Sequence, residues 1–218
     1  MRFTLALLLS ALGATFLTSC ASVSVRNVAS DANTARPTHF HVVPFTVDPA
    51  GVKENPARKN PGQLGREAQL LLANYVAHEL NQLGTPAAVF QGGKHLPGSW
   101  IVSGRITRLA EGNRLLRMAV GLGAGGTKME TQVDVRNAST RKQVLHFSTT
   151  GGSNATPGGV TNPIPFSGVP TALLNSKEGV TDDSARTARM IARTIAQAMV
   201  QRGWLAPGKV PPPKVARN

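Results

Sequence analysis

The strict alternation of residue types over residues 127–136 constrains the fold of this chain more than any other feature of the sequence. Threonine or apolar residues occupy every second position, and charged or amide residues occupy the positions between them. Successive side chains of a strand point to opposite faces of its sheet, so this period of two predicts a strand with one buried and one solvated face. A polar turn at 137–141 and a strand-like run at 142–149 follow, which together predict a hairpin.

Two further segments carry apolar residues at helical spacing. The first covers residues 63–83, and Gly84 ends it. The second runs to residue 200 before Gly203, and Asp182-Asp183-Ser184 predicts its N-terminal cap. The other strand-like runs cover residues 39–47, 87–90, 100–109 and 115–120. This order predicts an α/β fold: a mixed, largely antiparallel sheet with two helices packed on one face.

The first twenty residues predict export and a lipid anchor. Arg2 precedes an apolar run, residues 3–16, that is too short to cross about 30 Å of hydrocarbon and fits a secretory signal peptide. Leu17-Thr18-Ser19-Cys20 then stands where an ordinary cleavage site has small residues. The alternative interpretation is a plain signal peptide with an incidental cysteine.

The tetrapeptide that ends at Cys20 resembles the lipobox of bacterial lipoproteins. The resemblance implies cleavage before Cys20, a diacylglyceryl thioether on its sulfur and an acyl chain on its amine. The next residues, Ala21-Ser22, lack the aspartate that marks inner-membrane lipoproteins. We therefore expect the chain to be lipid-anchored at the outer membrane, on its periplasmic face.

Composition limits the partners of the exported chain. The net charge is +13, but the basic residues are scattered, only 5% of residues are aromatic, and export removes the chain from nucleic acid. We expect no nucleic-acid partner and no nucleotide. Anionic groups of the envelope suit this charge, and an envelope protein or peptidoglycan is the expected partner beside the membrane. The alternative is that the charge serves solubility only.

Four regions follow along the chain. Residues 1–19 are the lipoprotein signal peptide, and 20–37 are a lipidated N-terminus and irregular polar tether. Residues 38–205 form a single α/β domain, in which Trp204 and Leu205 pack back onto the core. A Gly/Pro-rich loop at 151–181 interrupts this domain. Residues 206–218, rich in proline and basic residues, form a disordered tail.

Several apparent motifs lack the context that their chemistry needs. Residues 121–126 contain G-x-G-x-x-G, but a strand rather than a helix follows, so no dinucleotide site is expected. His78-Glu79 begins a zinc-protease pattern, but Gln82 replaces its second histidine. His39 and His41 share a strand face and could hold a metal with His95 or His146, although ordinary surface histidines are favoured.

Residues 100–135 (WIVSGRITRLAEGNRLLRMAVGLGAGGTKMETQVDV) resemble the core of a family of bacterial lipoproteins with an uncharacterised domain, domain-of-unknown-function family 4410. The similarity is carried by Gly104, Glu111-Gly112-Asn113-Arg114, Arg117, the glycines of 121–126 and the strand after them, and extends over about 39–204. The family implies no catalytic residues. Its element order is distantly similar to curli-secretion lipoproteins, the N-terminal domain of the Tol–Pal translocation protein and lipoprotein activators of penicillin-binding proteins, which is an analogy of fold only.

These observations favour a non-catalytic adaptor with no cofactor other than the covalent lipid on Cys20. The alternative is a periplasmic hydrolase with a site on the 151–181 loop, around Ser153 or His95. The candidate contact residues are Arg105, Arg114, Arg117, Gly121, Gly123, Gly125, Gly126, Arg186, Arg189 and Arg193.

Overall fold

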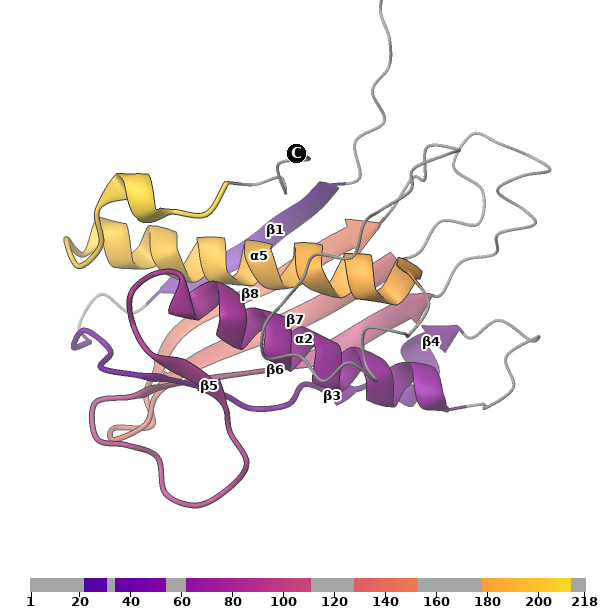
Figure 1. Cartoon of the computed structure of the whole chain (residues 1–218), viewed down its shortest axis with the longest axis horizontal. Coiled ribbons are helices and arrows are strands. Elements are labelled where there is room, and N and C mark those ends of the chain that lie inside the picture. The colour runs from indigo at the N-terminus through magenta and orange to yellow at the C-terminus, as the bar shows by residue number, and fades with distance from the viewer. Residues whose placement is uncertain (1–21, 31–33, 54–61, 111–127, 153–177, 213–218) are drawn as a thin grey trace, which may run out of the picture.

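The computed structural model describes residues 22–30, 34–53, 62–110, 128–152 and 178–212. The fold has two layers, in which one sheet carries two helices on the same face (Figure 1). The helices are α2 (Gln63–Asn81) and α5 (Glu178–Gln201). Within the ranges above, neither helix is long and apolar enough to cross a membrane.

The sheet has the strand order β1-β8-β7-β6-β2-β5, and two short strands, β3 and β4, also pair with β6. The strands are β1 (Ser22–Ser30), β2 (Phe40–Val42), β3 (Thr46–Val47), β4 (Val52–Lys53), β5 (Ala87–Val89), β6 (Trp100–Ala110), β7 (Lys128–Asn137) and β8 (Gln143–Gly152). The four long strands pair antiparallel with one another. The short strands β2, β3 and β4 each pair in parallel with β6, and β5 pairs in parallel with β2. The predicted fold class, a mixed and largely antiparallel sheet with two helices on one face, is therefore confirmed.

The alternation that predicted β7 divides its side chains as expected. Met129, Val133 and Val135 are fully buried beneath the helices. In β6, however, the register shifts between Ile106 and Arg108, which marks a β-bulge. Because the bulge adds one residue, Leu109 joins the buried face and Arg108 leaves it. A strict period of two along residues 100–109 would place Arg108 on the same face as Ile106, and the bulge makes that expectation wrong.

The second helix begins earlier than its sequence predicted. It starts at Glu178, so Asp183 and Ser184 lie inside it and are buried rather than forming its cap. Arg186, three residues further on, forms an ion pair with Asp183. This pairing, which lies within one helical turn, allows a carboxylate to remain in a buried helical position.

The segment assigned to an irregular tether contains a strand. β1 pairs antiparallel with β8 from Ser22↔Gly152 to Arg26↔Ser148, and Val25 packs against the core. Serine and asparagine gave the segment a loop-like composition, but Ser22-Val23-Ser24-Val25 alternates like an edge strand. The tether predicted over residues 20–37 is therefore corrected to a strand at Ser22–Ser30.

The chain after α5 folds back onto the domain, as predicted for Trp204, whose ring lies 5.9 Å from that of Trp100. A 3-10 turn, η2 (Pro207–Lys209), follows, and Val210 packs against the core. The guanidinium of Arg193 donates to the carbonyl oxygen of Pro211. The prediction of a disordered tail is thus wrong for 207–212, and residues 213–218 lie outside the described residues.

Candidate binding face

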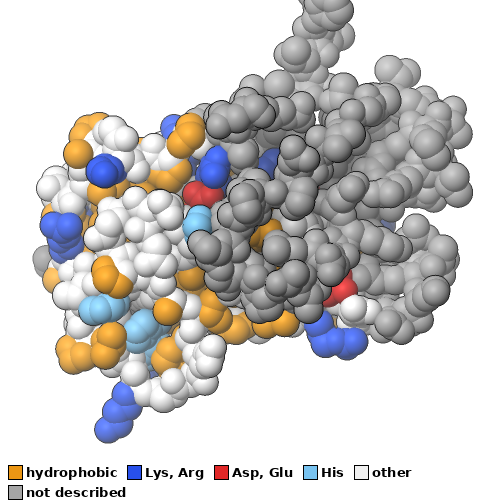
Figure 2. Space-filling view, viewed as in Figure 1, with side chains coloured by type: hydrophobic (Ala, Val, Ile, Leu, Met, Phe, Trp, Pro, Cys, Tyr) orange, Lys and Arg blue, Asp and Glu red, His pale blue; other side chains and the backbone are white. Residues whose placement is uncertain are grey.

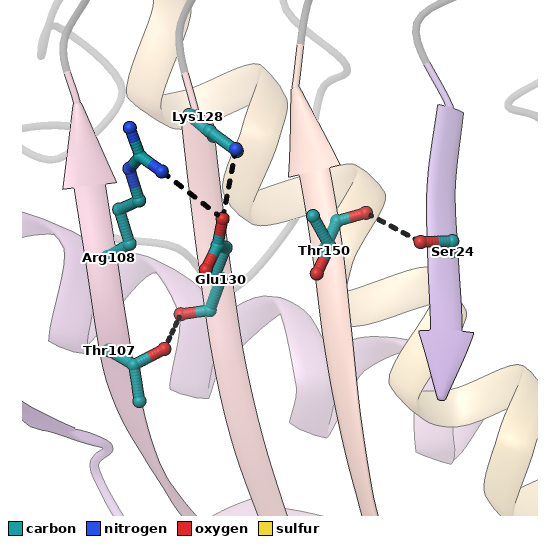
Figure 3. Close-up of polar contacts among 6 residues, drawn as sticks. All are labelled: Ser24, Thr107, Arg108, Lys128, Glu130 and Thr150. Atoms are coloured by element: carbon teal, nitrogen blue, oxygen red, sulfur yellow. Dashed lines mark hydrogen bonds and ion pairs between the residues drawn. The ribbon is translucent and has the colours of Figure 1, made fainter. Parts of the chain in front are cut away.

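The side of the sheet opposite the helices is a broad polar surface, the open face, formed by side chains of β1, β6, β7 and β8. Strand register arranges these side chains in rungs that cross all four strands. Figure 3 views part of this face, with the helices behind the strands. The three central rungs are Arg108–Glu130–Thr150–Ser24, Arg105–Gln132–Ser148–Arg26 and Ser103–Asp134–His146–Ala29.

The first of these rungs contains a carboxylate shared by two cations. Glu130 Oε1 lies 3.1 Å from Lys128 Nζ and 3.8 Å from Arg108 Nη1. All three side chains are partly exposed, Glu130 by 29%, Lys128 by 39% and Arg108 by 43%. The bulge in β6 makes this possible, because it turns Arg108 to the open face. Thr107, the neighbouring bulge residue, donates its hydroxyl to the carbonyl oxygen of Glu130 (Figure 3). The carboxylate of Glu130 therefore lies between two positive charges, Arg108 on the same rung and Lys128 on the next.

The third rung holds the other carboxylate of the face. Asp134 Oδ1 lies 3.0 Å from His146 Nδ1, so the imidazole donates to the carboxylate. This pairing gives His146 a role within the sheet. The prediction that His146 could join a metal site with His39 or His41 finds no support here, because the described residues hold no group of three or more metal-ligating side chains.

The middle rung carries charge that the face does not neutralise. Arg105 and Arg26 stand at its two ends, and Gln132 and Ser148 lie between them. Arg105, Arg26 and Gln132 are exposed. Among the ion pairs of the described residues, none involves Arg26, Arg105 or the exposed Arg136 of β7. The rung therefore presents two guanidinium groups with an amide and a hydroxyl between them.

Arg105 is the predicted contact residue that the structure places on this face. Sequence reasoning missed Arg26, because it assigned that residue to the tether. It placed Gln132 on the polar face of its strand but did not single it out. The signal for Arg26 was present in the alternation of residues 22–26, but only the pairing of β1 with β8 shows which face the residue occupies.

The three predicted arginines of α5, Arg186, Arg189 and Arg193, contact the protein itself. Arg189 donates from Nε and Nη2 to Glu79 Oε1 on α2, at 3.2 and 3.0 Å. Arg186 pairs with Asp183, and Arg193 binds the chain at Pro211. These contacts give the three side chains structural roles. Figure 2, which views the helix side, shows Lys and Arg side chains scattered singly over the described part of that surface.

A second polar cluster lies near the β5 edge of the sheet. The Nδ1 atoms of His41 and His95 are 2.8 Å apart, and the ring of Phe90 stacks on both imidazoles. Burial, together with the nearby His95 and His39, lowers the pKa of His41 below its ordinary value of 6.5. One imidazole donates to the other only while at least one of them is neutral. The cluster thus fastens the loop before β6 to β2.

The remaining predicted site residues lie outside the described residues: Cys20, Arg114, Arg117, Gly121, Gly123, Gly125, Gly126 and Ser153. Of the two residues on which the hydrolase alternative was based, only His95 is described, and its partner is His41.

Comparison with known proteins gives a family match. The family described as "Domain of unknown function (DUF4410)" matches residues 23–157, a span that begins within β1 and covers more than half of the chain. A comparison with curated proteins finds no match.

A comparison with solved structures finds matches that include three bacterial proteins. The PelC dodecamer from Paraburkholderia phytofirmans is 15% identical, with 75% of this chain and 93% of that chain covered and a TM-score of 0.38. The protein XCC0632 from Xanthomonas campestris, of family DUF330, is 12% identical, with 78% and 92% covered and a TM-score of 0.43. A proposed lipoprotein from Caulobacter crescentus CB15 is 16% identical, with 74% and 90% covered and a TM-score of 0.32.

Proposed function

The chain belongs to the DUF4410 family, and we propose that it is a lipoprotein of the outer membrane that acts in the periplasm as a non-catalytic binding or assembly adaptor. The lipid anchor is the part of the proposal that rests on sequence, through the lipobox at Cys20. Two or three acyl chains hold a protein at a membrane far more firmly than one does. The binding role rests on the open face.

The observation that carries the binding role is the middle rung of that face. Arg105 and Arg26 are exposed, have no acidic partner among the described residues, and flank Gln132 and Ser148. A guanidinium group binds a carboxylate through two parallel hydrogen bonds, and an amide or hydroxyl between two such groups adds donors and acceptors. The rung therefore suits a partner that presents carboxylates, such as an acidic envelope protein or the peptide stems of peptidoglycan.

A photo-cross-linking residue at position 132 tests this role in cells, with position 197 as the matched control. Gln132 lies on the open face and Gln197 lies on α5, and both side chains are exposed. We expect a cross-linked envelope protein or peptidoglycan fragment from position 132, and we expect it to be lost with Arg26→Glu and Arg105→Glu. Cross-linking from position 197 alone, or products that persist in the arginine variants, would contradict the binding role.

The anchor is tested separately by feeding cells a labelled fatty acid. Incorporation should be abolished by Cys20→Ser. Label that remains in this variant would show that the lipid is not on Cys20.

A further inference from the structure

We infer that the open face selects an extended protein segment with two acidic residues four positions apart, and that this segment lies across the strands, along the middle rung. The inference rests on the proposed function, because it names the kind of partner that the adaptor binds. The middle rung runs from Arg105 on β6 through Gln132 on β7 and Ser148 on β8 to Arg26 on β1.

The first argument is the distance between the two arginines. Arg105 and Arg26 lie on one rung, three strand spacings apart, and both are exposed. Neighbouring strands are about 4.8 Å apart, so the Cα atoms of the two arginines are separated by roughly 14 Å. A partner therefore pairs with both guanidinium groups at once only if its carboxylates are a similar distance apart.

An extended segment meets this spacing with acidic residues at positions i and i+4. Each residue of an extended chain advances about 3.4 Å, so four residues span about 14 Å. An even separation also places both side chains on the same side of the segment, whereas a separation of three places them on opposite sides. The residue at i+2 then faces Gln132 and Ser148, which supply an amide and a hydroxyl as hydrogen-bonding groups.

The second argument is the position of the acidic side chains on the open face. Glu130 and Asp134 lie two residues before and two residues after Gln132 on β7, so each is about 7 Å from the middle rung along the strand. The middle rung itself has no acidic member. A carboxylate-bearing segment therefore meets less repulsion on this rung than on either of its neighbours, one of which is drawn in Figure 3.

The direction of the segment follows from the continuation of the rung. In register with Arg105, the next strand, β3, presents Thr46, which is exposed and uncharged. A segment that pairs with both arginines and continues across the sheet therefore reaches Thr46. A segment that ran along β7 would instead reach Arg136, four residues from Gln132 and exposed on the same face.

Binding of fluorescent peptides to the lipidated full-length protein in neutral detergent tests the spacing. Two peptides have the same composition, rich in threonine, which favours an extended backbone. One carries two glutamates four positions apart, and the other carries them three positions apart. An exposed charge pair contributes up to about fivefold in affinity, so at about 0.1 M salt we expect the first peptide to bind about fivefold more tightly. Equal affinity for the two peptides would overturn the inference.

Variants of the arginines test which residues read the spacing. Arg26→Gln and Arg105→Gln should each weaken binding of the first peptide about fivefold, and together about 25-fold, because sites this far apart act additively. Each single variant should also bind the two peptides equally, since one guanidinium group remains. Arg136→Gln is the matched control, and its affinity should stay within about twofold because it lies about 13 Å from the rung, beyond the Debye length. A single variant that still prefers the first peptide would overturn the inference.

Photo-cross-linking of the first peptide tests the direction. The peptide extends about three residues beyond each glutamate, enough to reach the next strand about 4.8 Å away. With the photo-cross-linking residue at position 46 or at position 136, we expect the product to form mainly from position 46. More product from position 136 would show that the segment runs along the strands and would overturn the inference.

The cross-linking in cells from position 132 separates this inference from the proposed function. If that product forms and is lost with Arg26→Glu and Arg105→Glu, but both peptides bind equally, the spacing is refuted and the binding role stands. If no such product forms, the binding role itself is refuted. A peptidoglycan stem peptide that binds more tightly than the first peptide would show that the partner is not a protein segment and would overturn the inference.

Discussion

The ion pair between the two helices should contribute to the free energy of unfolding, by an amount that follows from its geometry. Glu79 on α2 accepts two hydrogen bonds from Arg189 on α5, and the two side chains are only 9% and 19% exposed. Arg189→Ala leaves the carboxylate of Glu79 in this interface without its counter-charge. Breaking a fully buried pair costs about 3–5 kcal/mol, and because this pair retains some contact with water we expect about 2–3 kcal/mol.

The measurement is equilibrium unfolding in urea. With a slope of about 2 kcal/mol per molar urea, typical for a domain of this size, Arg189→Ala should lower the midpoint by roughly 1–1.5 M. Arg136→Ala is the matched control, because Arg136 is exposed and lies on the open face. A surface substitution of this kind changes the free energy of unfolding by no more than about 0.5 kcal/mol.

A double substitution separates the pair from its surroundings. Glu79→Leu with Arg189→Met replaces two charges by apolar side chains of similar volume, and such replacements are often neutral or stabilising. The double variant should therefore be more stable than Arg189→Ala. The reasoning is refuted if Arg189→Ala unfolds at the same urea concentration as Arg136→Ala, since the carboxylate would then not depend on its partner.

Three further predictions concern the sheet and the histidine cluster. Gly104→Ala should lower the free energy of unfolding by about 2 kcal/mol, measured in urea, because the new Cβ would lie 2.4 Å from a carbonyl oxygen of β7. A variant as stable as the native protein would contradict this reasoning. Thr131→Val should cost about 1–2 kcal/mol in the same assay, because it removes the buried 2.8 Å bond to the hydroxyl of Thr149, and Val at both positions should restore most of the loss. Because the pKa of His41 is lowered on folding, the unfolded chain binds the proton more readily as the pH falls through 6.5. The melting temperature should therefore decline below that pH, and less steeply in His41→Gln. An equal decline in both proteins would exclude His41 as its cause.

The elements that the sequence predicted correctly are those with a local pattern. The period of two in 127–136 and the helical stripe in 63–83 depend only on neighbouring residues, so both β7 and α2 could be recognised. β1 has the same alternation, but its serines are typical of loops, and its partner β8 lies more than a hundred residues away, as the bond from Ser24 to Thr150 shows. Long-range pairing decided the structure of that segment, and a single sequence does not reveal it.

The same difference between local patterns and long-range contacts explains which residues of the candidate site could be predicted from the sequence. Arg105 was singled out because its strand was predictable. Arg189 lies on an equally predictable helix, but its contact with Glu79 joins residues 110 positions apart, so a side chain that stabilises the helix interface resembled a surface cation. The bulge in β6 had a similar effect on Arg108, because one additional residue reverses every assignment after it.

The charge pattern of the open face restricts how a partner could bind. The unneutralised rung of Arg105 and Arg26 lies between two rungs that contain Glu130 and Asp134. An anionic segment that ran along the strands would pass one of these carboxylates, whereas a segment that crossed the strands would contact both arginines and neither acid. The charge pattern therefore favours a partner segment that crosses the strands over one that runs along them.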